Sequence, residues 1–315
     1  MNEMTNESPQ KSFWQDTAEC WQRLPNKAFF FVLLGGWLLL FQFFGNPILG
    51  YVHSPSIFTW MMSQYNRPES DDSHGPLVPF LVVGIFWWKR HELLGLPLKM
   101  WTPGLPILVL AMAMQIFGYL IQQPYITIAA MFTGVWALMG LAWGPQWLRY
   151  SLFPFVLFVF CVPLGAHGQV ITFPLQQLVS WLTEKVAHVL GVDVVRVGTQ
   201  LFDPSGSYGY EVAAACSGIR SLVVVFLLAT TYGFIAFDTW RQRLLLIALA
   251  VPFAILGNLL RMVLIIMVAA LVSFDAGNYI HASPIFSVLP YVPAIAGFLL
   301  MGRWLERREE KKSSA

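Results

Sequence analysis

Long apolar runs recur along the whole chain and constrain its fold more than any other feature of the sequence. A transmembrane helix needs roughly 17 to 25 consecutive, mainly apolar residues. Eight runs approach or meet that length. They cover residues 28–45, 76–88, 103–122, 125–144, 150–166, 211–236, 244–272 and 284–302. We therefore predict an all-α polytopic membrane protein with about eight transmembrane helices.

The composition favours a membrane protein and argues against other classes. Of the 315 residues, 57% are hydrophobic and only 11% are charged, and the mean hydropathy is +0.60. A water-soluble domain of this length has a much more polar composition. The net charge of +2 is too small to indicate a nucleic-acid partner. We expect the lipid bilayer as a partner, no nucleic acid and no cofactor.

The distribution of cations predicts the orientation of the helices. If all eight runs cross and the N-terminus lies inside, fourteen of the 19 Lys and Arg residues face the cytoplasm, as the positive-inside rule predicts. They are Lys11, Arg23, Lys27, Lys89, Arg90, Lys99, Arg149, Arg241, Arg243, Arg303, Arg307, Arg308, Lys311 and Lys312. Without the short second run, the cations between residues 89 and 99 would lie outside. We predict a cytoplasmic segment over 1–27, a transmembrane domain over 28–302 and a charged cytoplasmic tail over 303–315.

Two predicted outer segments, at about 46–75 and 167–210, are long enough to contribute to a site. The second begins with apolar residues spaced three and four apart, which indicates an amphipathic helix lying at the membrane interface. After it, Val194 to Phe202 and Ser207 to Val212 have the character of short strands around the turn-forming sequence Asp203-Pro204-Ser205-Gly206. We predict a short extracytoplasmic β-hairpin there, able to pair with an extended peptide.

Three chemically distinctive residues are predicted to lie at one level near the outer face. At 1.5 Å per residue, Cys216 lies roughly 7 Å from the outer end of the sixth helix, and Arg261 roughly 26 Å from the inner end of the seventh. His281 follows in the outer loop before the last helix. An arginine inside a membrane helix costs about 2.5–3.5 kcal/mol on insertion scales, so Arg261 has to face a partner or a wet cavity. Asn258, one turn before Arg261, can position it.

These residue types support acyl transfer. A guanidinium and the positive end of a helix both lower the pKa of a thiol, and Arg220 lies one turn after Cys216. His281 can take the thiol proton and pass it to a leaving amine. Arg261 keeps its own proton and suits the stabilisation of an oxyanion or a substrate carboxylate. A structural counterion role for Arg220 stays equally open.

Two functions from other classes also stay open. Ser217 with His281 would suffice for a serine-type intramembrane protease, although the neighbouring cations favour a thiolate over an alkoxide. A non-enzymatic transporter would bury Arg220 and Arg261 along its substrate path. Against a transporter, the runs show no inverted repeat and no intramembrane carboxylate.

The remaining candidate groups have simpler interpretations. Cys161, in the fifth run, is interpreted as a small buried hydrophobic residue, and Cys20 as a reduced cytoplasmic thiol. Four ionisable residues of the first outer segment match no metal-binding spacing, so a solvated loop is preferred and no metal site is predicted. They are His53, Asp71, Asp72 and His74.

Three blocks of the sequence resemble the signature of the exosortase/archaeosortase family. They are Ala215-Cys216-Ser217-Gly218-Ile219-Arg220-Ser221-Leu222, Gly257-Asn258-Leu259-Leu260-Arg261, and His281 at the start of the last run. The resemblance covers about residues 70–300 and includes Ser73-His74-Gly75-Pro76-Leu77-Val78-Pro79 and Val162-Pro163-Leu164-Gly165. It implies a membrane cysteine protease and transpeptidase acting on exported proteins. Their C-terminal sorting signal would be a Pro-Glu-Pro-like motif, a transmembrane helix and a basic tail.

The resemblance also implies roles for individual residues. Cys216 would form the acyl-thioester, Arg261 would act as a proton donor, and His281 would act as a stabiliser or base. His74, in a matching block, would belong to the substrate entrance. The protein would lie in the cytoplasmic membrane of a bacterium or archaeon with its site at the outer face, and the acceptor would be water, a lipid amine or a glycan.

Overall fold

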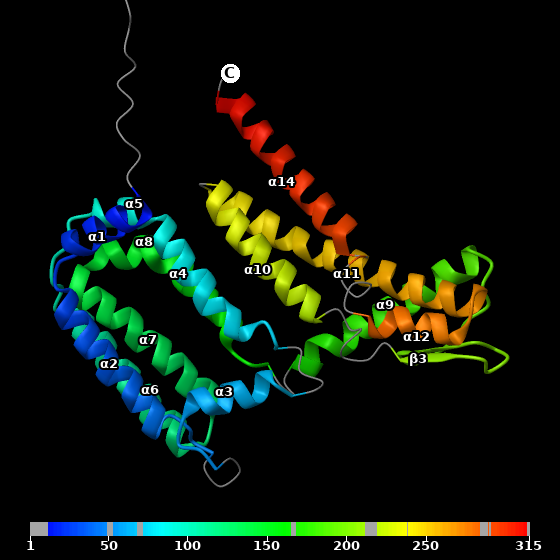
Figure 1. Ribbon diagram of the computed structural model, residues 1–315, viewed down its shortest axis with the longest axis horizontal. Coiled ribbons are helices and arrows are strands. Elements are labelled where there is room, and N and C mark those ends of the chain that lie inside the picture. Colours follow the sequence, from blue (N-terminus) through cyan, green and yellow to red (C-terminus); the bar gives the residue numbers. More distant parts are fainter. Residues whose placement is uncertain are drawn as a thin grey trace, which may run out of the picture. The chain divides into compact units, whose positions relative to one another are not determined.

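The computed structural model describes residues 12–48, 53–67, 72–164, 168–211, 219–237, 239–283, 289 and 291–313. The described chain is mainly helical, with one small sheet (Figure 1). It forms two compact units. The first contains Met1–Met61 and Pro79–Phe158, and the second contains Met62–Val78 and Val159–Ala315.

The first half of the chain is helical, and α7 is its most enclosed element. The elements are α1 (Phe13–Arg23), α2 (Lys27–Phe44), α3 (Ile57–Tyr65), the 3₁₀ turn η1 (Gly75–Leu77), α4 (Val78–Trp88), α5 (Arg90–Leu94), α6 (Gly104–Leu120), α7 (Pro124–Trp143) and α8 (Pro145–Val156). Helices α2 and α6 both pack against α7. The indole of Trp37 donates to the Met131 carbonyl at 2.9 Å. A Cβ at Gly134 would lie 2.1 Å from the Trp37 ring, so this contact between α2 and α7 requires glycine.

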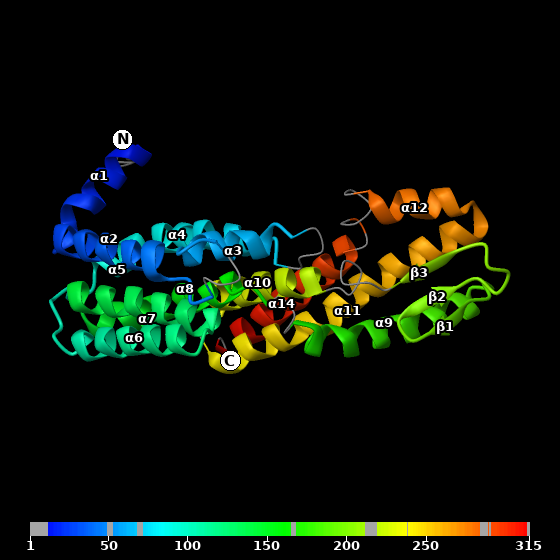
Figure 2. The same ribbon diagram turned by 90° about the horizontal axis from the view of Figure 1, so that it is seen from below.

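The elements that follow α8 are η2 (Leu157–Cys161), α9 (Gln169–Val189), β1 (Val195–Val197), β2 (Gln200–Phe202), β3 (Gly209–Glu211), α10 (Ile219–Ala236), α11 (Trp240–Leu271), α12 (Phe274–Ala282) and α14 (Tyr291–Ser313). In the second unit, the long helix α11 packs against α9, α10, α12 and α14. Side chains of α10 and α14 share a core with the first half of α11. Those of α9, the sheet and α12 share a second core with its last turns, and these elements lie together around the C-terminal part of α11 (Figures 1 and 2).

The apolar helices agree with the prediction of a membrane protein. Within the described residues, three are long and apolar enough to cross a bilayer, judged by length and composition: α2, α7 and α11. Shorter apolar helices cover Gly75–Trp88, Gly104–Leu120 and Val225–Ala236. These six helices coincide with six of the eight predicted runs.

The fifth and eighth predicted spans have different bounds in the structure. The fifth, predicted over 150–166, begins earlier as α8 and gives way at Val156 to the 3₁₀ turn η2. Pro154 lies inside α8 and lacks the N–H that the regular helix would use. The predicted start of the eighth span lies partly outside the described residues, and α14 continues through the charged tail to Ser313. The predicted boundary at 303 therefore falls inside a helix, because Glu, Lys and Arg are good helix formers.

The predicted two-stranded hairpin is a three-stranded antiparallel sheet with the order β1-β2-β3. The chain turns at Gly198 (φ +65°), which divides the first predicted strand, Val194 to Phe202, into β1 and β2. The turn predicted before β3 is present. The Asp203 carboxylate accepts hydrogen bonds from the Ser207 N–H at 3.2 Å and from its hydroxyl at 2.6 Å. Hydrogen bonds from Ser205 and Ser207 lower the pKa of Asp203, so this side chain stays ionised to a lower pH than an ordinary aspartate.

Candidate functional site

The candidate site is built on a helical hairpin made by α11 and α12. The Ser273 hydroxyl accepts a hydrogen bond from the Ala276 N–H at 3.1 Å and thereby caps the start of α12. A Cβ at Gly277 would lie 2.8 Å from the Cβ of Ala269, so glycine allows α12 to lie close against α11. Helix α12 therefore runs back alongside the last turns of α11 (Figure 2).

The hairpin brings Arg261 and His281 together. Arg261 lies about 15 Å before the end of α11, and His281 about 10 Å after the start of the returning α12. Nη2 of Arg261 donates to the backbone oxygen of His281 at 3.4 Å. Arg261 is 7% exposed, and Asn258, one turn earlier on α11, is 1% exposed. His281 was predicted to lie in a loop, but it lies in the last turn of α12.

Tyr210 of β3 lies next to His281, and the sequence did not predict this neighbour. Its ring centroid lies 6.1 Å from that of His281, and its hydroxyl donates to the Phe274 carbonyl at 3.4 Å. Burial, and to a smaller extent the charge of Asp275, raises the pKa of Tyr210. The phenol therefore stays protonated at neutral pH. The available signal was an aromatic residue in the strand that leads toward Cys216.

The environment of His281 favours a neutral imidazole. Burial lowers the pKa of His281 below its usual value of 6.5, and the positive charge of Arg261 lowers it further. Helix α12 lies outside the helices that meet the criteria for crossing a membrane. A neutral imidazole accepts a proton, and a buried guanidinium stabilises negative charge. The pair therefore combines a base with an electrostatic stabiliser.

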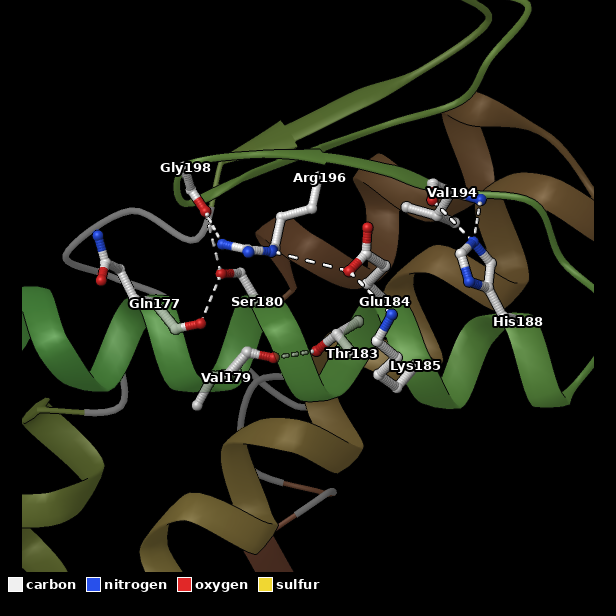
Figure 3. Close-up of polar contacts among 10 residues, drawn as sticks. All are labelled: Gln177, Val179, Ser180, Thr183, Glu184, Lys185, His188, Val194, Arg196 and Gly198. Atoms are coloured by element: carbon white, nitrogen blue, oxygen red, sulfur yellow. Dashed lines mark hydrogen bonds and ion pairs between the residues drawn. The ribbon is translucent and has the colours of Figure 1, made fainter.

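The sheet is held by polar side chains of α9 (Figure 3). The Ser180 hydroxyl donates to the carbonyl in the β1–β2 turn at 3.3 Å. The Glu184 carboxylate lies 3.8 Å from Nε of Arg196 on β1. Nε2 of His188 lies 2.9 Å from the Val194 carbonyl. These polar residues of the predicted interfacial helix contact the sheet, so α9 fixes the strands that lead into the candidate site.

His74 lies in a tightly held segment of the same unit. The Tyr65 hydroxyl donates to the backbone oxygen of Cys161, and the Cys161 thiol lies 3.6 Å from the Gly75 carbonyl. A Cβ at Gly75 would lie 2.4 Å from the Tyr65 ring. Cys161 is 2% exposed, which confirms the prediction of a small buried residue. The prediction of a solvated loop is wrong for Asp72 and His74, which are 5% and 9% exposed, because this packing encloses them.

Several predicted site residues, or their side chains, lie outside the described part of the chain. Cys216 and Ser217 lie outside the described residues, as does Asp71. Arg220 belongs to the first turn of α10, and its side chain is likewise outside the described part of the chain. His53 is described and exposed.

The apolar helices and the buried Arg261 beside a histidine define a polytopic membrane protein with a polar site. A sequence model of transmembrane exosortases matches residues 60–284, more than half of the chain. The protein therefore belongs to the transmembrane exosortase family. The matched region contains Cys216, Arg261 and His281. No curated protein and no solved structure matched the chain.

Proposed function

We propose that this protein is a cysteine-type membrane peptidase and transpeptidase with Cys216 as its nucleophile. One observation carries the proposal: the region matched to the exosortase family holds Cys216, and within the same region Arg261 contacts His281. The substrates are exported proteins with a C-terminal sorting signal. That signal is a Pro-Glu-Pro-like motif followed by a transmembrane helix and a basic tail.

In the first half-reaction, a neutral ring nitrogen of His281 takes the thiol proton of Cys216. The thiolate attacks the scissile carbonyl carbon, and the carbonyl π electrons move to oxygen, where the guanidinium of Arg261 stabilises the resulting oxyanion. The intermediate collapses, the C–N bond breaks, and the imidazolium returns its proton to the leaving amine. The products are an acyl-thioester on Cys216 and the released C-terminal helix with its tail.

In the second half-reaction, an acceptor attacks the thioester while His281 takes the acceptor's proton. The C–S bond breaks, and the sulfur regains a proton from His281. An amine acceptor gives a transpeptidation product, and water gives hydrolysis. Burial, and to a smaller extent the charge of Arg261, lowers the pKa of His281, so the imidazole is neutral between the steps.

Three further residues support this chemistry in the proposal. Asn258 positions Arg261 from the preceding turn of α11, where it is almost fully buried. Arg220 favours the thiolate of Cys216 or acts as a counterion. His74 lies at the substrate entrance. The site faces the outer side of the cytoplasmic membrane, where exported substrates arrive.

The proposal is tested by coexpressing the protein with a tagged substrate that carries the sorting signal. We expect Cys216→Ala to abolish cleavage and Ser217→Ala to retain it, because the Cys216 thiolate is the group that attacks the scissile carbonyl and forms the thioester. A tagged acyl-enzyme that hydroxylamine releases would show the intermediate directly. Cleavage by the Cys216→Ala variant together with its loss in Ser217→Ala would establish a serine protease instead. Solute uptake that persists without Cys216, with no cleavage, would establish a transporter.

A further inference from the structure

We propose that Asp16, Cys20 and His91 form a binding site for a zinc ion, separate from the proposed peptidase chemistry. These residues come from α1 and α5, which pack together in the first unit. One ligand atom from each residue lies within 4.8 Å of the other two. A carboxylate oxygen, a thiolate sulfur and an imidazole nitrogen are the donors that zinc takes in proteins.

The donor atoms lie near the separations of a tetrahedral ion, with one pair at such a distance and the others somewhat longer. Oδ1 of Asp16 lies 3.3 Å from Nε2 of His91 and 4.0 Å from Sγ of Cys20. Zinc bonds of about 2.0–2.3 Å place neighbouring tetrahedral ligands roughly 3.3–3.8 Å apart. The largest separation in the group is up to 4.8 Å, so metal binding requires the ligands to move closer, and the 58% exposed side chain of His91 has room to do so.

The sequence places two of the ligands on one side of a helix. Asp16 and Cys20 are separated by four residues of α1, so their side chains lie on the same face, one turn apart. Both lie on the sheltered side of the cluster, since the Asp16 side chain is 13% exposed and Cys20 is 9% exposed. His91 closes the group from α5.

Arg90 holds the Asp16 carboxylate in the orientation that a metal needs. Its guanidinium donates to Oδ2 of Asp16 through Nε at 2.7 Å and approaches the same oxygen through Nη2 at 2.5 Å. The guanidinium also lies over the Trp87 ring, 4.3 Å from its centroid, and donates to the Trp87 carbonyl at 2.9 Å. Oδ1 is thereby left directed at Cys20 and His91. A carboxylate that binds a cation through one oxygen and an arginine through the other matches the outer contacts of known zinc sites.

Three protein ligands leave one tetrahedral position for water. Such an ion would tie α1 to α5 at the same point as the Arg90–Asp16 ion pair. Without metal, the same residues would form only an ion-pair cluster with a weak thiol contact. The two arrangements differ in metal content and in the ionisation of Cys20, because a metal ligand is a thiolate.

The test uses the full-length protein, purified in detergent without a polyhistidine tag and supplied with zinc during expression. We expect about one zinc ion per chain by elemental analysis after dialysis. Replacement by cobalt should give a sulfur-to-cobalt charge-transfer absorption. Cys20→Ala should abolish that absorption and weaken zinc affinity by about tenfold or more, and His91→Gln should weaken it similarly.

Matched variants keep the test decisive. Cys216→Ala removes another thiol and His53→Gln another exposed histidine, and both should keep the zinc and the absorption. Cys20→His restores a ligand without sulfur, so it should keep zinc and lose the charge-transfer band. The proposal is overturned if the wild-type protein loses its zinc on dialysis. It is equally overturned if the cobalt band survives Cys20→Ala and disappears with Cys216→Ala.

Discussion

Arg261 is a charged residue buried inside a membrane-length helix, which indicates a functional role. A guanidinium with 7% exposure lies inside a helix long and apolar enough to cross a membrane. Insertion of an arginine at such a depth costs about 2.5–3.5 kcal/mol. The Arg261 guanidinium donates a hydrogen bond to the His281 carbonyl, so α12 offsets part of the cost of burying this charge. The same contact fixes the guanidinium beside the imidazole.

A conservative change at Arg261 separates charge from geometry. Lysine keeps the positive charge but lacks the planar donor fork. We expect Arg261→Lys to reduce the cleavage rate by about 10²- to 10³-fold, the range measured for loss of an oxyanion donor. Initial rates of substrate cleavage in membranes, at matched protein levels, measure this. A rate within about twofold of wild type would remove Arg261 from the chemistry.

The pH dependence of cleavage reports the environment of His281. Its pKa lies below 6.5 in the folded protein, so the neutral base predominates at pH 7, and activity falls only as pH drops through that lowered value. We expect the acidic limb of kcat/KM to have a midpoint below 6.5. Arg261→Gln removes the neighbouring charge and should move the limb to higher pH, whereas Arg261→Lys should leave it in place. A wild-type midpoint above 6.5, with identical limbs in all three proteins, would exclude His281 as the titrating base.

At the scale of elements, the close packing of α12 on α11 depends on one glycine. A Cβ at Gly277 would lie 2.5 Å from the Tyr210 hydroxyl and 2.8 Å from the Ala269 Cβ. Such overlap forces backbone movement, which typically costs about 1–3 kcal/mol. We expect Gly277→Ala to lower the Tm of the detergent-solubilised protein.

Gly84→Ala supplies the matched control for that measurement. Gly84 lies in α4, and a Cβ there meets nothing within 4 Å. Since Ala is the better helix former by about 1 kcal/mol, this variant should match or exceed the wild-type Tm. Equal losses in both variants would mean that glycine flexibility, rather than packing at α12, determines the result.

Much of the helical architecture was predictable because apolar runs report membrane helices directly. The bounds of α2, α7 and the end of α11 agree with the predicted runs to within about two residues. The interruption after α8 and the division of a strand at Gly198 were not predicted. Both depend on a single backbone position, which hydropathy averaged over a long run does not register.

The site was predictable in part, and for a chemical reason. A buried arginine is costly enough to be conspicuous in a sequence, and the length of the returning segment placed His281 near its level. Helix α12 was missed because it is short, although Ser273 before Asp275 was an available start signal. The contribution of Tyr210 depends on contacts between distant segments, which no local pattern contains.

For the whole molecule, the predicted orientation in the membrane depends on whether the short helix α4 crosses it. The apolar helix over Gly75–Trp88 extends about 21 Å, less than the roughly 30 Å of a bilayer core. Yet cations follow it directly at Lys89 and Arg90, and the positive-inside rule favours their retention in the cytoplasm. If α4 did not cross and all later spans did, every later segment would change side. Cys216 would then face the cytoplasm, away from exported substrates.

Reporter fusions distinguish these two topologies. We expect a fluorescent protein fused after Lys99 to be fluorescent and alkaline phosphatase at that point to be inactive, because α4 crosses and its cations stay inside. Fusion after Gly206, in the turn before β3, should give active phosphatase, since this segment is predicted to lie outside. The opposite pattern at both points would place the candidate site in the cytoplasm. A sorting function for exported proteins would then be untenable, even though the contact between Arg261 and His281 would stand.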